Sequence, residues 1–84
     1  MKTRSLPLGD RNMVGKRVTQ ARELRGMKQH ELLAKLQTAG IEISAPALSL
    51  LQGQKRPAAD FELAALADIF GVSVDWLLGR PENI

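Results

Sequence analysis

The sequence predicts an all-α protein, and two observations support that prediction. Apolar residues recur every three or four positions in five successive segments between Val14 and Gly79, which is the period of helices with one buried face. The gaps between these segments are short and contain glycine, proline or a capping serine, the residues that end and begin helices. With 84 residues and 44% hydrophobic composition, the chain can build one small core and has no room for a second domain.

The composition also excludes several classes of protein. Zero cysteines rule out a disulfide framework, and a single histidine argues against a structural zinc site. The acidic residues show no paired spacing that would set a general acid beside a base, so we expect neither catalysis nor a small-molecule cofactor. No apolar run is long enough to span a membrane, and the first eleven residues are too polar for a signal peptide. We therefore expect a cytoplasmic protein without membrane association.

The first helix follows a polar segment, residues 1–11, that has no apolar period and that we interpret as a flexible arm. Asp10 or Asn12 can cap this helix, and Gly26 ends it. Its inward stripe is predicted to be Val14, Val18, Ala21 and Leu24.

The second and third helices are separated by a connection that is longer than a tight turn. The second helix is predicted from Lys28 to about Thr38, with Gly40 stopping it and Leu32, Leu33 and Leu36 buried. Ser44 is a good N-cap and Pro46 suits a first turn, so the third helix is predicted over Ala45 to about Gln52. Its inward residues are predicted to be Leu48 and Leu51.

The last two helices follow a basic loop, Gly53–Pro57. Asp60 is predicted to cap the fourth helix and Gly71 to end it. Ser73 is predicted to cap a short fifth helix over Val74–Leu78, before a tail at 81–84. The stripe of the fourth helix is predicted to be Leu63, Leu66, Ala67 and Phe70.

Taken together, several stretches resemble the phage repressor/Cro family, the xenobiotic-response-element type of helix-turn-helix. These stretches are Val14–Val18, Arg22–Gln29, Leu48–Gln52, Glu62–Ala67 and Gly71–Gly79. The resemblance implies a five-helix, lambda-repressor-like domain over residues 12–80. This chain departs from the family pattern in having an elongated connection between its second and third helices. It also implies double-stranded DNA as the partner, a homodimer, and a role as a repressor-like transcriptional regulator.

The resemblance places the third helix, residues 45–52, in the DNA major groove. Gln29 would donate to a phosphate from beside the positive end of the second helix, although a solvated glutamine is the plain alternative. Lys55 and Arg56 would contact phosphates, or form an ordinary solvated pair. The full set of predicted DNA-binding residues is Lys28, Gln29, Ser44, Ala45, Ala47, Ser49, Gln54, Lys55 and Arg56.

The third helix departs from the family pattern because it is poor in polar side chains. Among its groove-facing positions only Ser49 can donate a hydrogen bond to a base, whereas bidentate readout needs Arg, Lys, Asn or Gln. Gln52 is expected to face the first helix, where a hydrogen bond to Arg22 replaces the family's charged pair. Contacts to thymine methyl groups, readout of DNA shape, or a protein partner in place of DNA all stay open. The last alternative is an antitoxin-like or adaptor module on the same fold.

The aromatic residues favour packing over nucleic-acid stacking. Phe70 completes a helix stripe, and Trp76 is expected to cover the core or a dimer contact. The homodimer interface is predicted around Val72, Trp76 and Leu77.

Overall fold

The computed structural model describes residues 12–80, and within that range the chain forms five α-helices and no strand. The helices are α2 (Gly15–Leu24), α3 (Gln29–Thr38), α4 (Ala45–Gln52), α5 (Asp60–Phe70) and α6 (Val74–Leu77). The all-α prediction is confirmed for this part of the chain, and α4 has the predicted bounds. The predicted arm at 1–11 and tail at 81–84 lie outside the described residues.

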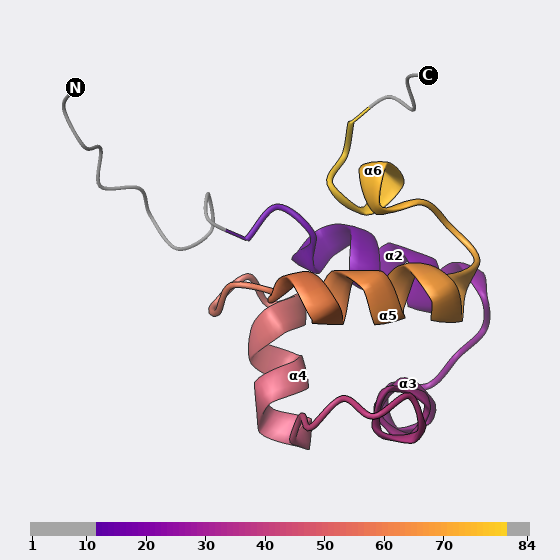
Figure 1. Ribbon diagram of the computed structural model, residues 1–84, viewed down its shortest axis with the longest axis vertical. Coiled ribbons are helices and arrows are strands. Elements are labelled where there is room, and N and C mark those ends of the chain that lie inside the picture. Colours follow the sequence, from indigo (N-terminus) through magenta and orange to yellow (C-terminus); the bar gives the residue numbers. More distant parts are fainter. Residues whose placement is uncertain (1–11, 81–84) are drawn as a thin grey trace, which may run out of the picture.

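The helices are arranged around a central pair, α2 and α5, which lie side by side in Figure 1. Helix α6 packs on both of them from one side, whereas α3 and α4 lie on the other side. Figure 1 views α3 end-on while α4 runs from top to bottom in the plane of the picture, so these two helices are steeply inclined to each other. Helix α4 contacts α2 and α3, and its outer side faces away from the rest of the fold.

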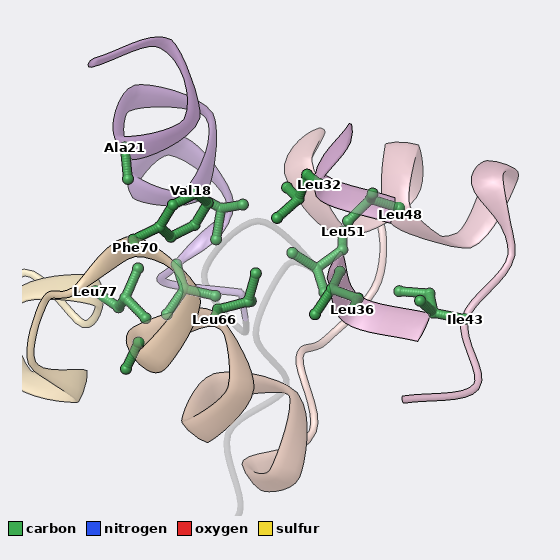
Figure 2. Close-up of a cluster of buried hydrophobic side chains, with 12 residues drawn as sticks. Val18, Ala21, Leu32, Leu36, Ile43, Leu48, Leu51, Leu66, Phe70 and Leu77 are labelled. Carbon is green, nitrogen blue, oxygen red and sulfur yellow. The ribbon is translucent and has the colours of Figure 1, made fainter. Parts of the chain in front are cut away.

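One hydrophobic core joins all five helices. Figure 2 shows Leu32, Leu36, Leu48 and Leu51, from α3 and α4, gathered in one half of the cluster. The other half is formed by α2, α5 and α6, through Val18, Ala21, Leu66, Phe70 and Leu77. Nearly complete burial of these side chains, with Leu48 at 0% exposure and Leu51 at 1%, fixes which face of α4 points inward.

Leu24 was expected to complete the inward stripe of α2, and that expectation was wrong because Leu24 is 67% exposed. The stripe Val14, Val18 and Ala21 continues at position 25, eleven residues after its start, because eleven residues complete about three helical turns. Position 25 holds Arg25, whose Nε and Nη2 donate to the carbonyl oxygen of Phe70 at 3.0 and 2.8 Å. The predicted apolar contact is thus replaced by a polar one that holds the end of α5.

The starts of α4 and α6 follow the sequence prediction, whereas the start of α5 departs from it. Ser44 Oγ accepts from the backbone N–H of Ala47, and Ser73 Oγ accepts from that of Trp76, as predicted. Asp60, however, is the first residue of α5 rather than its cap, and the Glu62 carboxylate accepts from the backbone N–H of Ala59 instead. A glutamate three residues into the helix performs this role in a capping box.

Helix α6 is held against α2 by an aromatic contact. The Arg17 guanidinium lies 4.7 Å from the centre of the Trp76 ring, a cation–π geometry. Gly71 allows the sharp chain reversal before α6 because it has a φ of 68°, a left-handed conformation that suits glycine. Helix α6 ends at Leu77, one residue earlier than predicted. Leu33 and Leu63, expected to be buried, are only half-buried at the edge of the core.

Candidate nucleic-acid interface

Helix α4 has one face locked into the core and one face open to solvent. The four exposed side chains within the helix belong to Ala45, Pro46, Ser49 and Leu50. Positions three and four apart on a helix lie on the same side, so these residues form a single continuous surface, the outer face of α4. Neither an acidic residue in the first turn nor a basic residue in the last turn is present.

Two predicted contact residues of α4 are more constrained than expected. Ala47 is half-buried and packs against the core, so it cannot belong to the outer face in the way that Ala45 does. Position 47 lies next to Leu48 and four residues before Leu51, which brings it to the border of the buried face. The Ser44 hydroxyl accepts the Ala47 N–H at 3.2 Å, so its oxygen caps the helix.

Gln52, the last residue of α4, is the centre of a polar network between three helices. Its Oε1 accepts from Arg22 Nε at 3.2 Å and from Thr19 Oγ1 at 3.3 Å, both on α2. Its Nε2 donates to Gln29 Oε1 at 2.7 Å, at the start of α3. The expected hydrogen bond between Arg22 and Gln52 is therefore present. Gln52 also donates a hydrogen bond to Gln29, which was predicted to bind DNA.

This network fixes the orientation of two side-chain amides. Arginine has no acceptor, so Gln52 must turn its oxygen toward Arg22 and its nitrogen toward Gln29. Gln29 must in turn present its own oxygen to Gln52. Its Nε2 group is consequently the part of the side chain left to donate elsewhere, and Gln29 is half-buried with access to solvent.

Asn12 and Gly15 join the C-terminal end of α4 to the start of α2. The side chain of Asn12 is 1% exposed, and its Nδ2 donates to the carbonyl oxygens of Leu51 and Arg56 at 2.7 and 2.6 Å. Its Oδ1 accepts from the backbone N–H groups of Val14 and Gly15, so Asn12 holds the turn that leads into α2, whose N-cap is Val14 rather than the predicted Asp10 or Asn12. A Cβ on Gly15 would lie 2.5 Å from Leu51 O, which means that only glycine permits this close approach.

The loop after α4 contains two basic residues, one of them exposed and the other in an ion pair. Lys55 is exposed, as expected for a phosphate contact. Arg56 instead pairs with Glu62, through Nη2 to Oε2 at 2.6 Å and Nη1 to Oε1 at 3.1 Å. The Arg56 guanidinium thus braces the loop against α5, a structural role that the prediction of a phosphate contact did not include. Gln54 also faces inward, since its Nε2 donates to Asn12 O at 3.0 Å.

The Glu62 carboxylate is 3% exposed, and this ion pair decides its protonation. Burial alone would raise its pKa, but the hydrogen bonds from Arg56 and from the Ala59 N–H, together with the Arg56 charge, outweigh burial and hold the pKa below its ordinary value. The Glu62 carboxylate in turn raises the pKa of Arg56, chiefly through their hydrogen bond. The pair is therefore fully charged at neutral pH.

The contact between Gln29 and Gln52 brings the start of α3 next to the C-terminal end of α4. Lys28 precedes Gln29 and is exposed, and Lys55 follows α4 by three residues and is exposed as well. Most of the predicted site is thus gathered around that end of α4. Ser44 and Ala45 lie at its other end, one helix length away.

Two structural features of the site were missed by sequence reasoning. The part-buried ion pair joins residues six apart, a spacing with no helical period, and the sequence carries only half of a capping-box signal because Ala59, not serine or threonine, lies three residues before Glu62. The double role of Asn12 depends on a contact with a carbonyl 39 residues away, which no local pattern contains.

The predicted dimer surface is only partly exposed. Leu77 is 0% exposed and packs in the core, so it cannot contact a second copy. Trp76 and Val72 are half-buried, and Val74 is 37% exposed beside them.

Comparison of the chain with family models, with curated proteins and with solved structures finds no match. Within residues 12–80, no helix is long and apolar enough to cross a membrane.

Proposed function

We propose that this protein binds double-stranded DNA as a small, repressor-like transcriptional regulator of the cytoplasm. In this proposal the fold is lambda-repressor-like, α3 and α4 form the helix-turn-helix, and the outer face of α4 enters the major groove. The observation that carries the proposal is the outer face itself. It belongs to a capped helix whose opposite side is buried and whose end is anchored, so it projects from the fold in a defined orientation.

The surroundings of α4 support the same partner. Lys28 and Lys55 are exposed near its C-terminal end, where they would meet phosphates on either side of the groove. The amide nitrogen of Gln29 is oriented by Gln52 as a donor, which suits a phosphate oxygen. Arg56 is assigned no contact with DNA in this proposal because Glu62 already engages it.

The first test measures binding of a mixed-sequence duplex as a function of salt. Log affinity should fall linearly with log salt, with a slope of about −0.9 for each phosphate contacted. Replacing Lys28 and Lys55 with alanine together should weaken binding to all sequences and make that slope shallower by about 2. Lys35→Ala is the control, because Lys35 lies beside Ile69 of α5 in the hollow at the other end of α3. Equal loss in both variants would exclude this surface.

The second test separates binding from folding at the outer face. Ala45→Glu adds an acidic residue to the first turn of α4, where it favours the helix, but sets a negative charge against phosphates. We expect an unchanged melting temperature and loss of DNA binding. Ala64→Glu, on an exposed position of α5, adds the same charge elsewhere and should leave binding intact. Intact binding by Ala45→Glu would remove α4 from the interface.

The second candidate function is a protein-interaction module on this fold, antitoxin-like or adaptor-like. It is favoured by Leu50, which is 45% exposed on a face that carries no charge. Absence of any duplex binding at low salt, with a folded protein, would favour this candidate over the first.

A homodimer is part of the DNA-binding proposal, because a face with one hydroxyl offers few contacts per copy. A twofold dimer would set two copies of α4 about 34–36 Å apart, one turn of DNA. The surface proposed for it is Val72, Val74 and Trp76, on α6 and the turn before it. In Figure 1, α6 lies on the opposite side of the fold from α4. Sedimentation that finds only monomer, both free and on DNA, would reject the dimer.

A further inference from the structure

The outer face of α4 lacks the side chains that recognise guanine or adenine. Bidentate contacts to these purines come from Arg, Lys, Asn or Gln, and Ala45, Pro46, Ser49 and Leu50 include none of these. The Ser49 hydroxyl is its single polar side-chain group. The rest of the face is carbon: a methyl group, a proline ring and a leucine side chain that is 45% exposed.

The glutamines around α4 also make hydrogen bonds within the protein. Gln52 donates to Gln29 and accepts from Arg22, as described above. Gln37 Nε2 donates to Ile43 O at 3.2 Å, and Gln54 Nε2 donates to Asn12 O. Each of these amides would have to break an internal hydrogen bond before it could make the paired contact that reads adenine. The neighbouring polar side chains therefore do not replace what the helix lacks.

One group in the major groove matches an exposed carbon surface, namely the C5-methyl group of thymine. Burial of a methyl group against Leu50, Pro46 or Ala45 removes apolar surface from water without any need for a hydrogen-bond partner. Resting on the DNA-binding function proposed above, we infer that this protein selects thymine-rich duplexes by contact between the outer face of α4 and thymine methyl groups. Phosphate contacts supply general affinity, and the methyl contacts supply the selectivity.

The test compares duplexes that differ only by that methyl group. An alternating dA·dT duplex is compared with a dA·dU duplex, in which the methyl is removed and every hydrogen-bonding group is kept. A dI·dC duplex is compared with its 5-methylcytosine counterpart, in which a methyl is added at the same position in the groove. We expect binding to weaken about three- to fourfold for each contacted methyl that is removed, and to strengthen by a similar factor where one is added.

Two variants connect the effect to α4. Leu50→Ser should reduce the difference between dA·dT and dA·dU duplexes while leaving the salt dependence unchanged. Leu24→Ser is the matched control, because Leu24 is 67% exposed on α2 and outside the proposed interface. Circular dichroism of both variants should match the unmodified protein, since neither leucine is buried.

The outcomes distinguish this inference from the function on which it rests. Equal binding of dA·dT and dA·dU duplexes would overturn the methyl contact and leave DNA binding standing. A preference for dA·dU and dI·dC over dG·dC, without any effect of the methyl, would assign selectivity to groove shape instead. Failure to bind every duplex at low salt would overturn both proposals together.

Discussion

The two ends of α4 are held in very different ways. Its C-terminal end is joined to α2 by the hydrogen bonds of Asn12, the close approach of Gly15 and the network around Gln52. Its N-terminal end follows an irregular connection, residues 39–44, that lines two open hollows of about 680 and 490 Å³. Ser44 and a hydrogen bond from Gln37 to Ile43 support that end. The hydrogen bonds and close contacts that join α4 to α2 are therefore concentrated at its C-terminal end.

The largest expected effect comes from closing the space at Gly15. In Gly15→Ala the new Cβ would meet Leu51 O at 2.5 Å and Gln52 O at 2.9 Å, both backbone atoms that cannot move aside cheaply. We expect a loss of about 3 kcal/mol in the free energy of unfolding, at the upper end for overpacking. Urea denaturation measures it.

Gly53→Ala is the control for that variant, because Gly53 lies at the same end of α4 with a φ of −79° and its nearest contact would be Ser49 O at 3.3 Å. Its stability should change by less than about 1 kcal/mol. Equal effects of the two alanines would show that the close approach of Gly15 to the C-terminal end of α4 does not make this position more sensitive to an added methyl group.

Asn12→Ala should have the next largest effect. It removes the acceptor for the backbone N–H groups of Val14 and Gly15 and the donor to the carbonyl oxygens of Leu51 and Arg56, of which Leu51 O keeps the backbone N–H of Gln54. About 2–3 kcal/mol should be lost. Gln37→Ala removes the corresponding hydrogen bond at the other end of α4 and should cost well under about 1 kcal/mol, because Gln37 is exposed. Thermal unfolding of the pair therefore tests the comparison directly.

A smaller effect is expected from Glu62→Gln, and it should depend on pH. The pKa of Glu62 is held below its ordinary value of 4.5 in the folded protein, so the unfolded chain takes up this proton more readily. The stability that Glu62 provides is therefore complete above pH 4.5 and is lost as pH falls through the lowered pKa. At neutral pH the variant should lose about 1–2 kcal/mol, because Arg56 keeps partial access to solvent.

Stability measured between about pH 6 and about pH 2 should accordingly fall less steeply for Glu62→Gln than for the unmodified protein. Asp68→Asn, an exposed carboxylate of the same helix, is the control. A slope that is unchanged by Glu62→Gln would contradict the assignment of the ion pair as the source of the acid dependence.

The smallest expected effect is a gain. Gln52→Glu would turn the hydrogen bond with Arg22 into a charge-assisted one, and we expect a stabilisation of about 0.5–1 kcal/mol, or several degrees in melting temperature. Gln29 would have to rotate its amide to donate to the new carboxylate. The gain should shrink at high salt and vanish in an Arg22→Met background. A lower melting temperature would mean that the present amide network is worth more than the charge.

Much of the fold follows from local patterns in the sequence. The bounds of α4, the caps Ser44 and Ser73 and the inward Leu48 and Leu51 were all predicted, because capping residues and helical periodicity are short-range signals. Leu24 was misplaced because a drift in period over ten residues moved it off the stripe. The start of α5 was shifted by one residue because Glu62 caps it from inside the helix.

The site was less predictable than the fold. Which glutamine faces solvent and which faces a neighbour depends on contacts between helices, as for Gln52 and Gln54. Arg56 and Lys55 are adjacent in the sequence, yet one is paired and the other is exposed, because only Arg56 lies within reach of Glu62. The burial of Ala47 and of Leu77 likewise follows from how the helices pack, and composition contains no signal for it.

The contact at Gly15 also brings oppositely charged ends of two helix dipoles together. The start of α2, whose N–H groups carry partial positive charge, meets the end of α4, where the carbonyl groups of Leu51 and Gln52 carry partial negative charge. The negative pole of α4 is thereby compensated inside the protein. No acidic side chain in the first turn compensates its positive pole, at Ala45. Helix α4 therefore presents a partial positive charge at its free end although it contains no ionisable residue.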